Sequence, residues 1–118
     1  MGRWGLLLTL LTVCGGMIIG SYAPSGLAQD TGITPEFLSD PANIGLGKTL
    51  WLKRCQYCHG KAAYPGKAPK LKPRRYTADF VYDRVTYGFR KMPAWEKIYS
   101  REERMAVVAF VLSREFSP

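Results

Sequence analysis

The sequence predicts an all-α domain of about three to four short helices joined by long loops. Helix-start signals, in which Asp, Ser or Thr precedes an apolar stretch, occur three times. No stretch shows a convincing alternation of apolar and polar residues, which is the pattern of a β-strand. The 118 residues allow one domain. Long loops around so few helices make a poor core, so we expect a bound prosthetic group that the loops enclose.

The N-terminal segment, residues 1–28, is expected to be a secretory signal peptide rather than part of the fold. Arg3 is the only charge before Asp30, and an apolar run covers residues 6–20. The small residues at 26–28 suit cleavage after residue 28. These features predict export to the periplasm.

Two alternatives for this segment stay open. The apolar run could remain as an uncleaved membrane anchor, although it is short and contains glycines. Cys14 could carry a lipid, but the residue before it, Val13, does not suit that modification. Membrane contact is therefore expected only through residues 1–28, and only if they are not removed.

The first half of the mature chain is divided by its prolines. Residues 29–39 contain Gly, Thr and Pro and are expected to form an extended arm. Asp40 can cap a helix whose first residue is Pro41, and this helix should end near the next pair of cysteines. Residues 60–75 contain three closely spaced prolines, which exclude a regular helix and predict a loop.

The second half contains two further predicted helices. Thr77 is a plausible cap for the first, and Gly88 ends it. Residues 89–99 form another loop. Ser100, with Glu103 three residues later, is a capping box for a last helix that should run to about Glu115.

The charge is strongly basic, with 17 Lys and Arg against 9 Asp and Glu, a formal charge of +8. Nine of the basic residues lie in residues 48–75, which contain no acidic residue. This basic block favours an anionic partner. Export disfavours a nucleic acid. The scarcity of carboxylates and the single His leave little material for a large metal cage or a multi-residue hydrolase site.

The motif that carries the chemistry runs from Cys55 to His59 and reads C-x-x-C-H, which is typical of covalent c-type haem attachment. The two thiols add to the two haem vinyl groups, and His59 becomes an axial ligand of the iron. A thioredoxin-like dithiol pair would need a βαβ context, and a zinc site would need further Cys or His ligands. A structural disulfide between Cys55 and Cys58 is the plainest alternative.

The second axial ligand is predicted to be Met92. It lies in a loop between two predicted helices and precedes Pro93, which restricts the chain just after it. Met105 falls on the apolar face of the last helix and is expected to be a core residue. Lys91 is a rival ligand, although an amine is less usual with this haem.

Because of the Cys55–His59 motif and the later Met92-Pro93 pair, the chain resembles the class I monohaem c-type cytochromes of the small bacterial periplasmic type. The resemblance covers residues 41–113. It implies a cytochrome c fold for residues 40–118, with long loops wrapped around one covalent haem c. It also implies that the first and last helices cross, with Gly47 and Trp51 matching the first and Val107 and Phe110 matching the last.

The resemblance also assigns roles in the loop after the motif. In the family, a proline carbonyl accepts the N–H of the proximal His, and a leucine packs on the haem. Here Pro69 and Leu71 match those positions, whereas Ala68 replaces the usual Gly. The implied site is therefore Cys55, Cys58 and His59 with Pro69 and Leu71, and with Met92 on the other side of the iron.

The resemblance implies a one-electron carrier rather than an enzyme, because two protein ligands leave the iron no open position. Two roles stay open: a diffusible or anchored carrier of the respiratory chain, between a quinol:cytochrome c reductase and a terminal oxidase, or a cytochrome subunit bound tightly to a periplasmic dehydrogenase or membrane redox complex. A haem-based ligand sensor is a weaker third. The basic block predicts docking on the acidic surface of such a redox partner.

Overall fold

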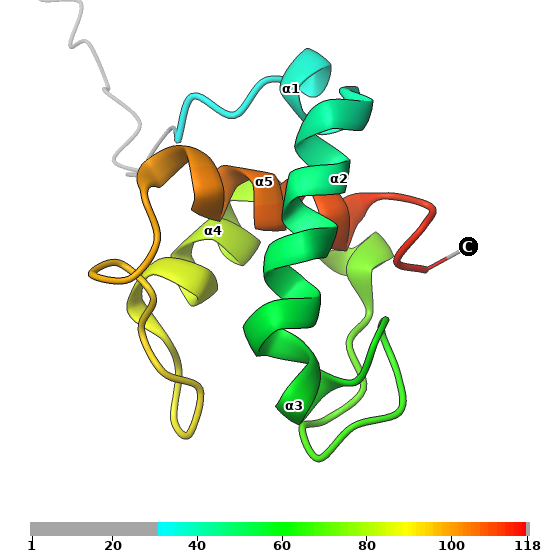
Figure 1. Cartoon of the computed structure of the whole chain (residues 1–118), viewed down its shortest axis with the longest axis vertical. Helices are drawn as coiled ribbons and strands as arrows, with labels where there is room; N and C mark the ends of the chain where they lie inside the picture. The colour runs from blue at the N-terminus through cyan, green and yellow to red at the C-terminus, as the bar shows by residue number, and fades with distance from the viewer. Residues whose placement is uncertain (1–30, 118) are drawn as a thin grey trace, which may run out of the picture.

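The computed structural model describes residues 31–117, and this part of the chain is helical. Figure 1 shows the arrangement. Within these residues no strand forms, and a single isolated bridge joins Phe89 and Met92. The predicted all-α class is confirmed. The expected signal peptide, residues 1–28, lies outside the described residues. The helical elements are α1 (Pro35–Ser39), α2 (Pro41–Leu50), the π-helical turn η1 (Trp51–Cys55), α3 (Gln56–His59), the 3-10 turn η2 (Pro73–Arg75), α4 (Ala78–Tyr87) and α5 (Arg101–Leu112).

The first long helical segment is continuous from α2 through η1 to α3. It begins as predicted: an Asp40 carboxylate oxygen accepts the backbone N–H of Ala42 at 2.8 Å, and Pro41 is the first helical residue. It ends at Gly60, whose φ of +85° lies outside the range that other residues readily adopt. Both cysteines of the motif and His59 therefore lie on the last turns of this segment.

The helical segment crosses α5 at a point where the two backbones nearly touch, as Figure 1 shows. A Cβ atom on Gly47 would lie 1.9 Å from the carbonyl oxygen of Ala106 and 2.9 Å from Cβ of Phe110. One turn further on, the rings of Trp51 and Phe110 contact each other edge to face, with centroids 6.1 Å apart. The expected crossing of the first and last helices is confirmed.

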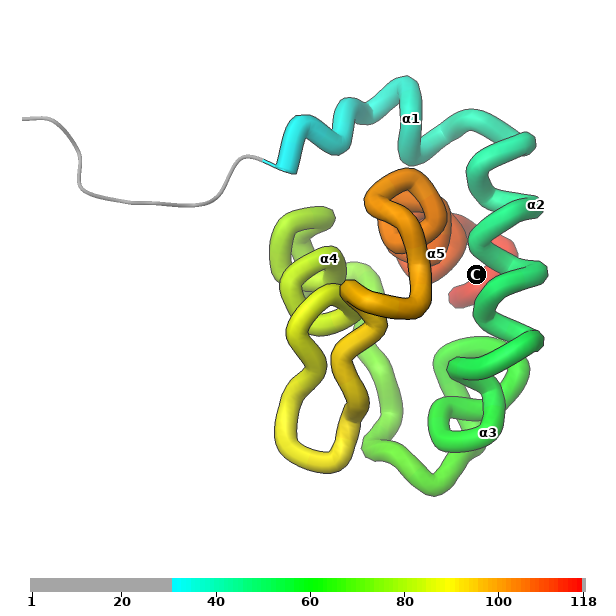
Figure 2. The backbone as a smooth tube through the Cα atoms, turned by 60° about the vertical axis from the view of Figure 1, so that its left-hand side comes forward, coloured from blue at the N-terminus to red at the C-terminus, as the bar shows by residue number. Residues whose placement is uncertain are grey.

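The helix α5 forms the centre of the core. Residues 104–111 are all buried, and α1, α2 and α4 all pack against this helix. In Figure 2, α4 and α2 lie on opposite sides of α5. Met105, expected in the core, is 6% exposed.

Both ends of α5 have local explanations. The predicted capping box is present, because Ser100 Oγ accepts the Glu103 N–H and a Glu103 carboxylate oxygen accepts the Ser100 N–H. The helix ends at Leu112 rather than near Glu115. Ser113 is extended, and its N–H and hydroxyl both donate to the carbonyl of Phe110 at 3.0 and 2.7 Å, which satisfies the end of the helix.

The expectation of an extended arm over residues 29–39 is wrong for residues 35–39. Residues 35–39 form α1, capped by Thr34, and α1 packs against α5. Before it, the Thr31 hydroxyl donates to the Asp79 carboxylate at 2.5 Å, and Arg101 donates to the carbonyl of Thr31. The sequence reading missed that Thr34-Pro35 is itself a helix start.

The helices of residues 31–117 are all too short or too polar to cross a membrane.

Candidate haem-binding site

The Cys-x-x-Cys pair lies on one face of the helical segment at its C-terminal end. Cys55 closes η1, and Cys58 follows three residues later on α3, so the two side chains are neighbours on the helix. No disulfide joins them: both are free thiols, with Cys55 half-buried and Cys58 exposed. Burial, with a further contribution from the charge of Cys58, raises the pKa of Cys55 to about 11. Cys55 is therefore a protonated thiol at neutral pH.

His59 is held by the helix that carries it. The Trp51 ring lies against the imidazole, with centroids 5.4 Å apart, and its indole N–H donates to the carbonyl of Gly60 at 2.9 Å. Burial lowers the pKa of His59 below its ordinary value of 6.5, so the ring is neutral at pH 7. A neutral imidazole is the form that binds a metal.

The expected hydrogen bond from His59 to the carbonyl of Pro69 is not formed. Within the described residues the Nδ1 atom of His59 is buried and has no hydrogen-bond partner, and Pro69 is exposed. The loop is held instead one residue earlier, where the Ala68 N–H donates to the carbonyl of Cys58 at 2.7 Å. The residue that replaces the family's Gly therefore provides the contact.

The loop after the motif approaches it closely through two glycines. A Cβ on Gly60 would lie 1.8 Å from the carbonyl oxygen of Pro65. A Cβ on Gly66 would lie 2.4 Å from the carbonyl oxygen of Cys58. Sequence reasoning treated these residues only as signs of a loop. Leu71, at the end of this loop, is half-buried against the core, with its N–H donating to the carbonyl of Ala63 at 3.3 Å.

Met92 is fixed by a tight turn. Phe89 and Met92 exchange two backbone hydrogen bonds of 3.0 and 3.1 Å, and Arg90 between them has a φ of +55°. Gly88 precedes the turn with a φ of +72°, and a Cβ there would lie 2.4 Å from the carbonyl oxygen of Met92. After the turn, the Trp95 N–H donates to the end of α4 at 3.1 Å.

The α3 segment and the turn of residues 89–92 both lie at the end of the molecule opposite α1 in Figures 1 and 2. Cys55, Leu71 and Met92 are half-buried and pack against the same core cluster. Tyr99, which sequence reasoning missed, is also buried: its ring stacks on Trp95 at 5.6 Å, and burial raises its pKa.

These observations fit a haem. Two free thiols at the right spacing, a half-buried imidazole whose Nδ1 atom is buried and unpaired, and a half-buried thioether are donors that could hold a covalent haem. Residues 31–117 contain no group of three or more His, Cys, Asp or Glu side chains that could hold a different metal.

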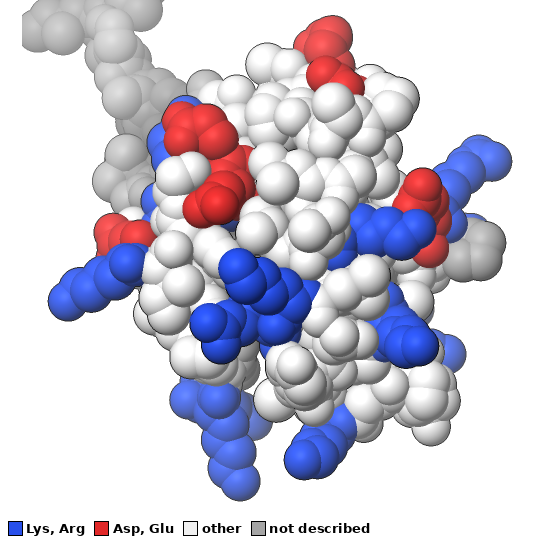
Figure 3. Space-filling view, viewed as in Figure 1, with Lys and Arg blue, Asp and Glu red and all other residues white. Residues whose placement is uncertain are grey.

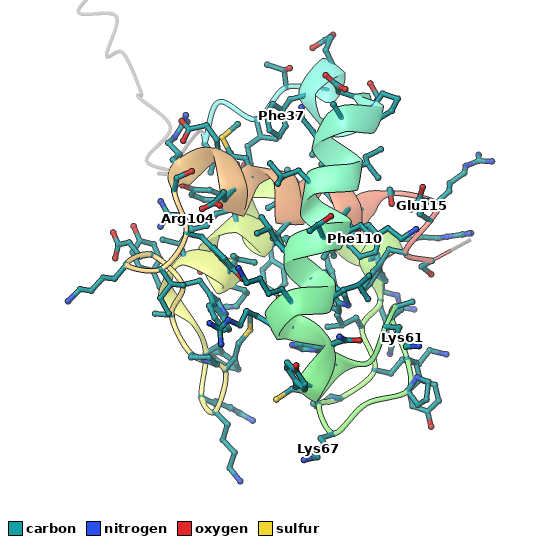
Figure 4. The ribbon with its side chains drawn as sticks, in the orientation of Figure 1. Phe37, Lys61, Lys67, Arg104, Phe110 and Glu115 are labelled. Atoms are coloured by element: carbon teal, nitrogen blue, oxygen red, sulfur yellow. The ribbon has the colours of Figure 1, made fainter. Side chains whose placement is uncertain are left out.

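The surface around this end is basic. Figure 3 shows Lys and Arg side chains gathered over the lower half of the molecule, with most carboxylates in the upper half. Figure 4 shows Lys61 and Lys67 extending outward from the loop after α3. In the basic block only Lys48 has an ion pair within the described residues, with Glu115 at 2.9 Å.

The comparisons with known proteins agree with this site. Residues 42–111 match the family described as cytochrome C oxidase, cbb3-type, subunit III. The chain is 38% identical over 97 residues to the cytochrome c subunit of 4-cresol dehydrogenase [hydroxylating] from Pseudomonas putida, covering 82% of this chain and 80% of the relative.

Solved structures show the same fold. The c-type cytochrome NirC superposes with a TM-score of 0.53 at 25% identity, covering 67% of this chain and 99% of that one. Cytochrome cL from the marine methylotrophic bacterium Methylophaga aminisulfidivorans gives a TM-score of 0.58 at 18% identity, covering 80% of this chain and 69% of that one.

The fold and the attachment motif define an electron-transfer protein with a covalent haem c. The chain belongs to the c-type cytochromes, in the family of the cbb3-type oxidase subunit III cytochrome domain. It resembles the monohaem class I members, and it is an electron carrier rather than an enzyme.

Proposed function

We propose that this cytochrome passes single electrons through one haem c whose iron is bound by His59 and Met92. The observation that carries the proposal concerns Met92: it is half-buried at the end of a turn closed by two backbone hydrogen bonds, and it packs against the same core cluster as Cys55. The other methionine of the described residues, Met105, is buried within α5.

Bound in this way, the haem would supply one-electron chemistry. The protein would prevent the iron from reacting with oxygen or peroxide. His59 and Met92 would fill both axial positions, which leaves no site for oxygen or peroxide. A thioether ligand stabilises ferrous iron and so raises the reduction potential. Half-buried apolar side chains such as Leu71 and Trp95 support the proposal, because they would limit the access of water to the haem.

The proposed ligand is tested with Met92→Ala, using Met105→Leu as the matched control. In the ferric protein, a thioether bound to iron gives a near-infrared charge-transfer band. We expect this band in the wild type and in Met105→Leu, and we expect it to disappear in Met92→Ala with a lowered reduction potential. A wild-type protein without the band would refute the assignment of Met92.

The protein is proposed to work in the periplasm after export through residues 1–28. The basic N-terminus, the apolar run and the small residues before residue 29 support this placement. Membership of a bacterial family whose proteins are typically exported agrees with it.

The proposed partner is the acidic surface of a redox protein, because the basic block lies at the same end of the molecule as the haem attachment motif. That partner could be an oxidase or a quinol:cytochrome c reductase.

A second candidate role, as the cytochrome subunit of a dehydrogenase, is favoured by one observation. The relative that is 38% identical is named as a subunit of such an enzyme. Purification at native expression levels separates the two roles. A larger subunit recovered in equal amounts would establish the subunit role, and a cytochrome recovered alone would establish the free carrier.

A further inference from the structure

The outer face of α4 and the turn that follows carry a continuous series of stacked side chains. The rings of Tyr76 and Phe80 lie 5.2 Å apart. The guanidinium of Arg84 lies over Phe80 at 5.0 Å and over Phe89 at 4.5 Å, and that of Arg90 lies over Phe89 at 5.1 Å. We call this series the aromatic–arginine ladder, and its members are Tyr76, Phe80, Arg84, Phe89 and Arg90.

Three of the five ladder residues, Phe80, Phe89 and Arg90, are exposed, and Tyr76 and Arg84 are half-buried. Phe80 is 43% exposed and Phe89 is 51% exposed, whereas Val81 and Val85 on the same helix are buried in the core. Phe80 on α4 and Phe89 in the turn after it are therefore aromatic residues that the core does not enclose. Exposed aromatic residues that adjoin one another, unlike single ones, indicate an interaction surface.

The arginines of the ladder are held in place for recognition. Stacking on the phenylalanine rings restricts each guanidinium and leaves its N–H groups at the edges, which suits paired hydrogen bonds to a carboxylate. Aromatic residues and arginine are also the types that contribute most to protein interfaces. Side chains that are already ordered lose less entropy on binding.

The charge of the ladder indicates what binds it. Arg84 has one carboxylate beside it, Asp83 at 3.4 Å, whereas Arg90 makes no ion pair within residues 31–117. Lys91 follows in the same turn and adds a further positive charge. A second copy of this chain would bring like charges together. A surface with carboxylates between apolar side chains would match both components of the ladder.

The ladder ends at the proposed haem ligand. Phe89 and Met92 exchange both of their backbone hydrogen bonds, and Arg90 lies within that turn. A protein bound to Phe89 and Arg90 would therefore rest against the turn that carries Met92.

We propose that the aromatic–arginine ladder is the surface on which the electron-transfer partner docks, and that the partner's contact face presents carboxylates beside apolar side chains. The inference rests on the proposed function, since it places the partner next to the proposed ligand. The basic block attracts the partner over a distance, and the ladder provides the specific contact.

Photocrosslinking of the full chain in its native host tests the location. A photoreactive phenylalanine derivative replaces Phe80 in one variant and Leu46 in the control. Leu46 is 42% exposed and lies on α2, on the other side of α5. We expect crosslinks at position 80 alone, to an acidic peptide of a protein that exchanges electrons with the haem. No crosslink at position 80, equal crosslinking at both positions or a crosslinked dimer of this chain would overturn the proposal.

The crosslinked partner, purified, then provides the probe for affinity. Arg90→Glu is compared with Arg114→Glu, which makes the same charge change in the segment that follows α5. In Figure 1 this segment lies on the side of the molecule away from α4. We expect Arg90→Glu to weaken binding at least about tenfold, and Arg114→Glu to change it by less than about twofold. Equal effects would overturn the docking site.

The near-infrared band separates this inference from the proposed function. If Arg90→Glu keeps the band and binds as the control does, the docking site is wrong and the haem ligation stands. If the wild type lacks the band, the ligation proposal fails, whatever the binding result.

Discussion

At the residue scale, His59 is oriented by Trp51 rather than by the loop that follows it. The indole ring of Trp51 lies against the imidazole. The indole N–H donates a hydrogen bond to the carbonyl of Gly60, the residue next to His59. The histidine and the end of its helix are thus fixed by one side chain. Trp51 is 4% exposed and contacts Phe110 and Phe116 on its other sides, so it connects the motif to the core.

Replacing Trp51 with Phe keeps an aromatic ring but removes the N–H donor. The carbonyl of Gly60 then loses its partner, which costs about 1–3 kcal/mol when the group is buried. We expect the free energy of unfolding, measured with denaturant, to fall by about that amount. An unchanged midpoint would show that the hydrogen bond does not hold the motif.

The sequence indicated which residues form the proposed site, but it did not indicate the contacts that hold those residues in position. C-x-x-C-H identifies its residues by spacing alone, and only two methionines follow residue 28, which left few choices for the predicted second ligand. The contact between Trp51 and His59 and the close approach of Gly66 to Cys58 depend on how the chain folds back, which no local pattern records. The position of Gly60 directly after His59 was an available signal of a helix end.

At the scale of elements, the crossing of α2 and α5 determines where the motif lies. Gly47 brings the two backbones into contact, because any larger residue would place Cβ 1.9 Å from the carbonyl oxygen of Ala106. The continuous helix then carries Cys55 and His59 away from this crossing to the end of the molecule where the Met92 turn also lies.

Gly47→Ala and Gly45→Ala form a matched pair that tests this crossing. Both glycines lie in α2, but a Cβ on Gly45 has no atom within 4 Å. We expect Gly47→Ala to destabilise the protein by at least about 2 kcal/mol through overpacking. Gly45→Ala should stabilise it by about 0.5–1 kcal/mol, because alanine is the better helix former. Equal effects in denaturant unfolding would contradict the close crossing.

The beginnings of the elements were more predictable than their ends. Asp40, Thr77 and Ser100 cap helices as expected, because a capping side chain acts within a few residues of itself. The end of α5 at Leu112 and the π-helical turn of η1 were not predicted. The short helix α1 was missed because its residues were judged by composition rather than by the Thr-Pro start signal.

At the scale of the whole molecule, the two ends differ in charge. One end holds α1 and several of the carboxylates, and the other holds the motif, the Met92 turn and most of the basic block. The division follows from the sequence, since residues 48–75 contain nine basic residues and no acidic one. Such a surface would steer an acidic partner towards the end of the molecule that carries the attachment motif.

The central claim is that one covalent haem per chain, with both axial positions filled by side chains, carries one electron. A spectroelectrochemical titration of the purified protein tests it most directly. The account predicts a single reversible one-electron step, a haem that stays with the polypeptide after acid extraction, and a reduced form that does not bind carbon monoxide readily. A haem that can be extracted, or rapid binding of carbon monoxide by the reduced wild-type protein, would contradict it.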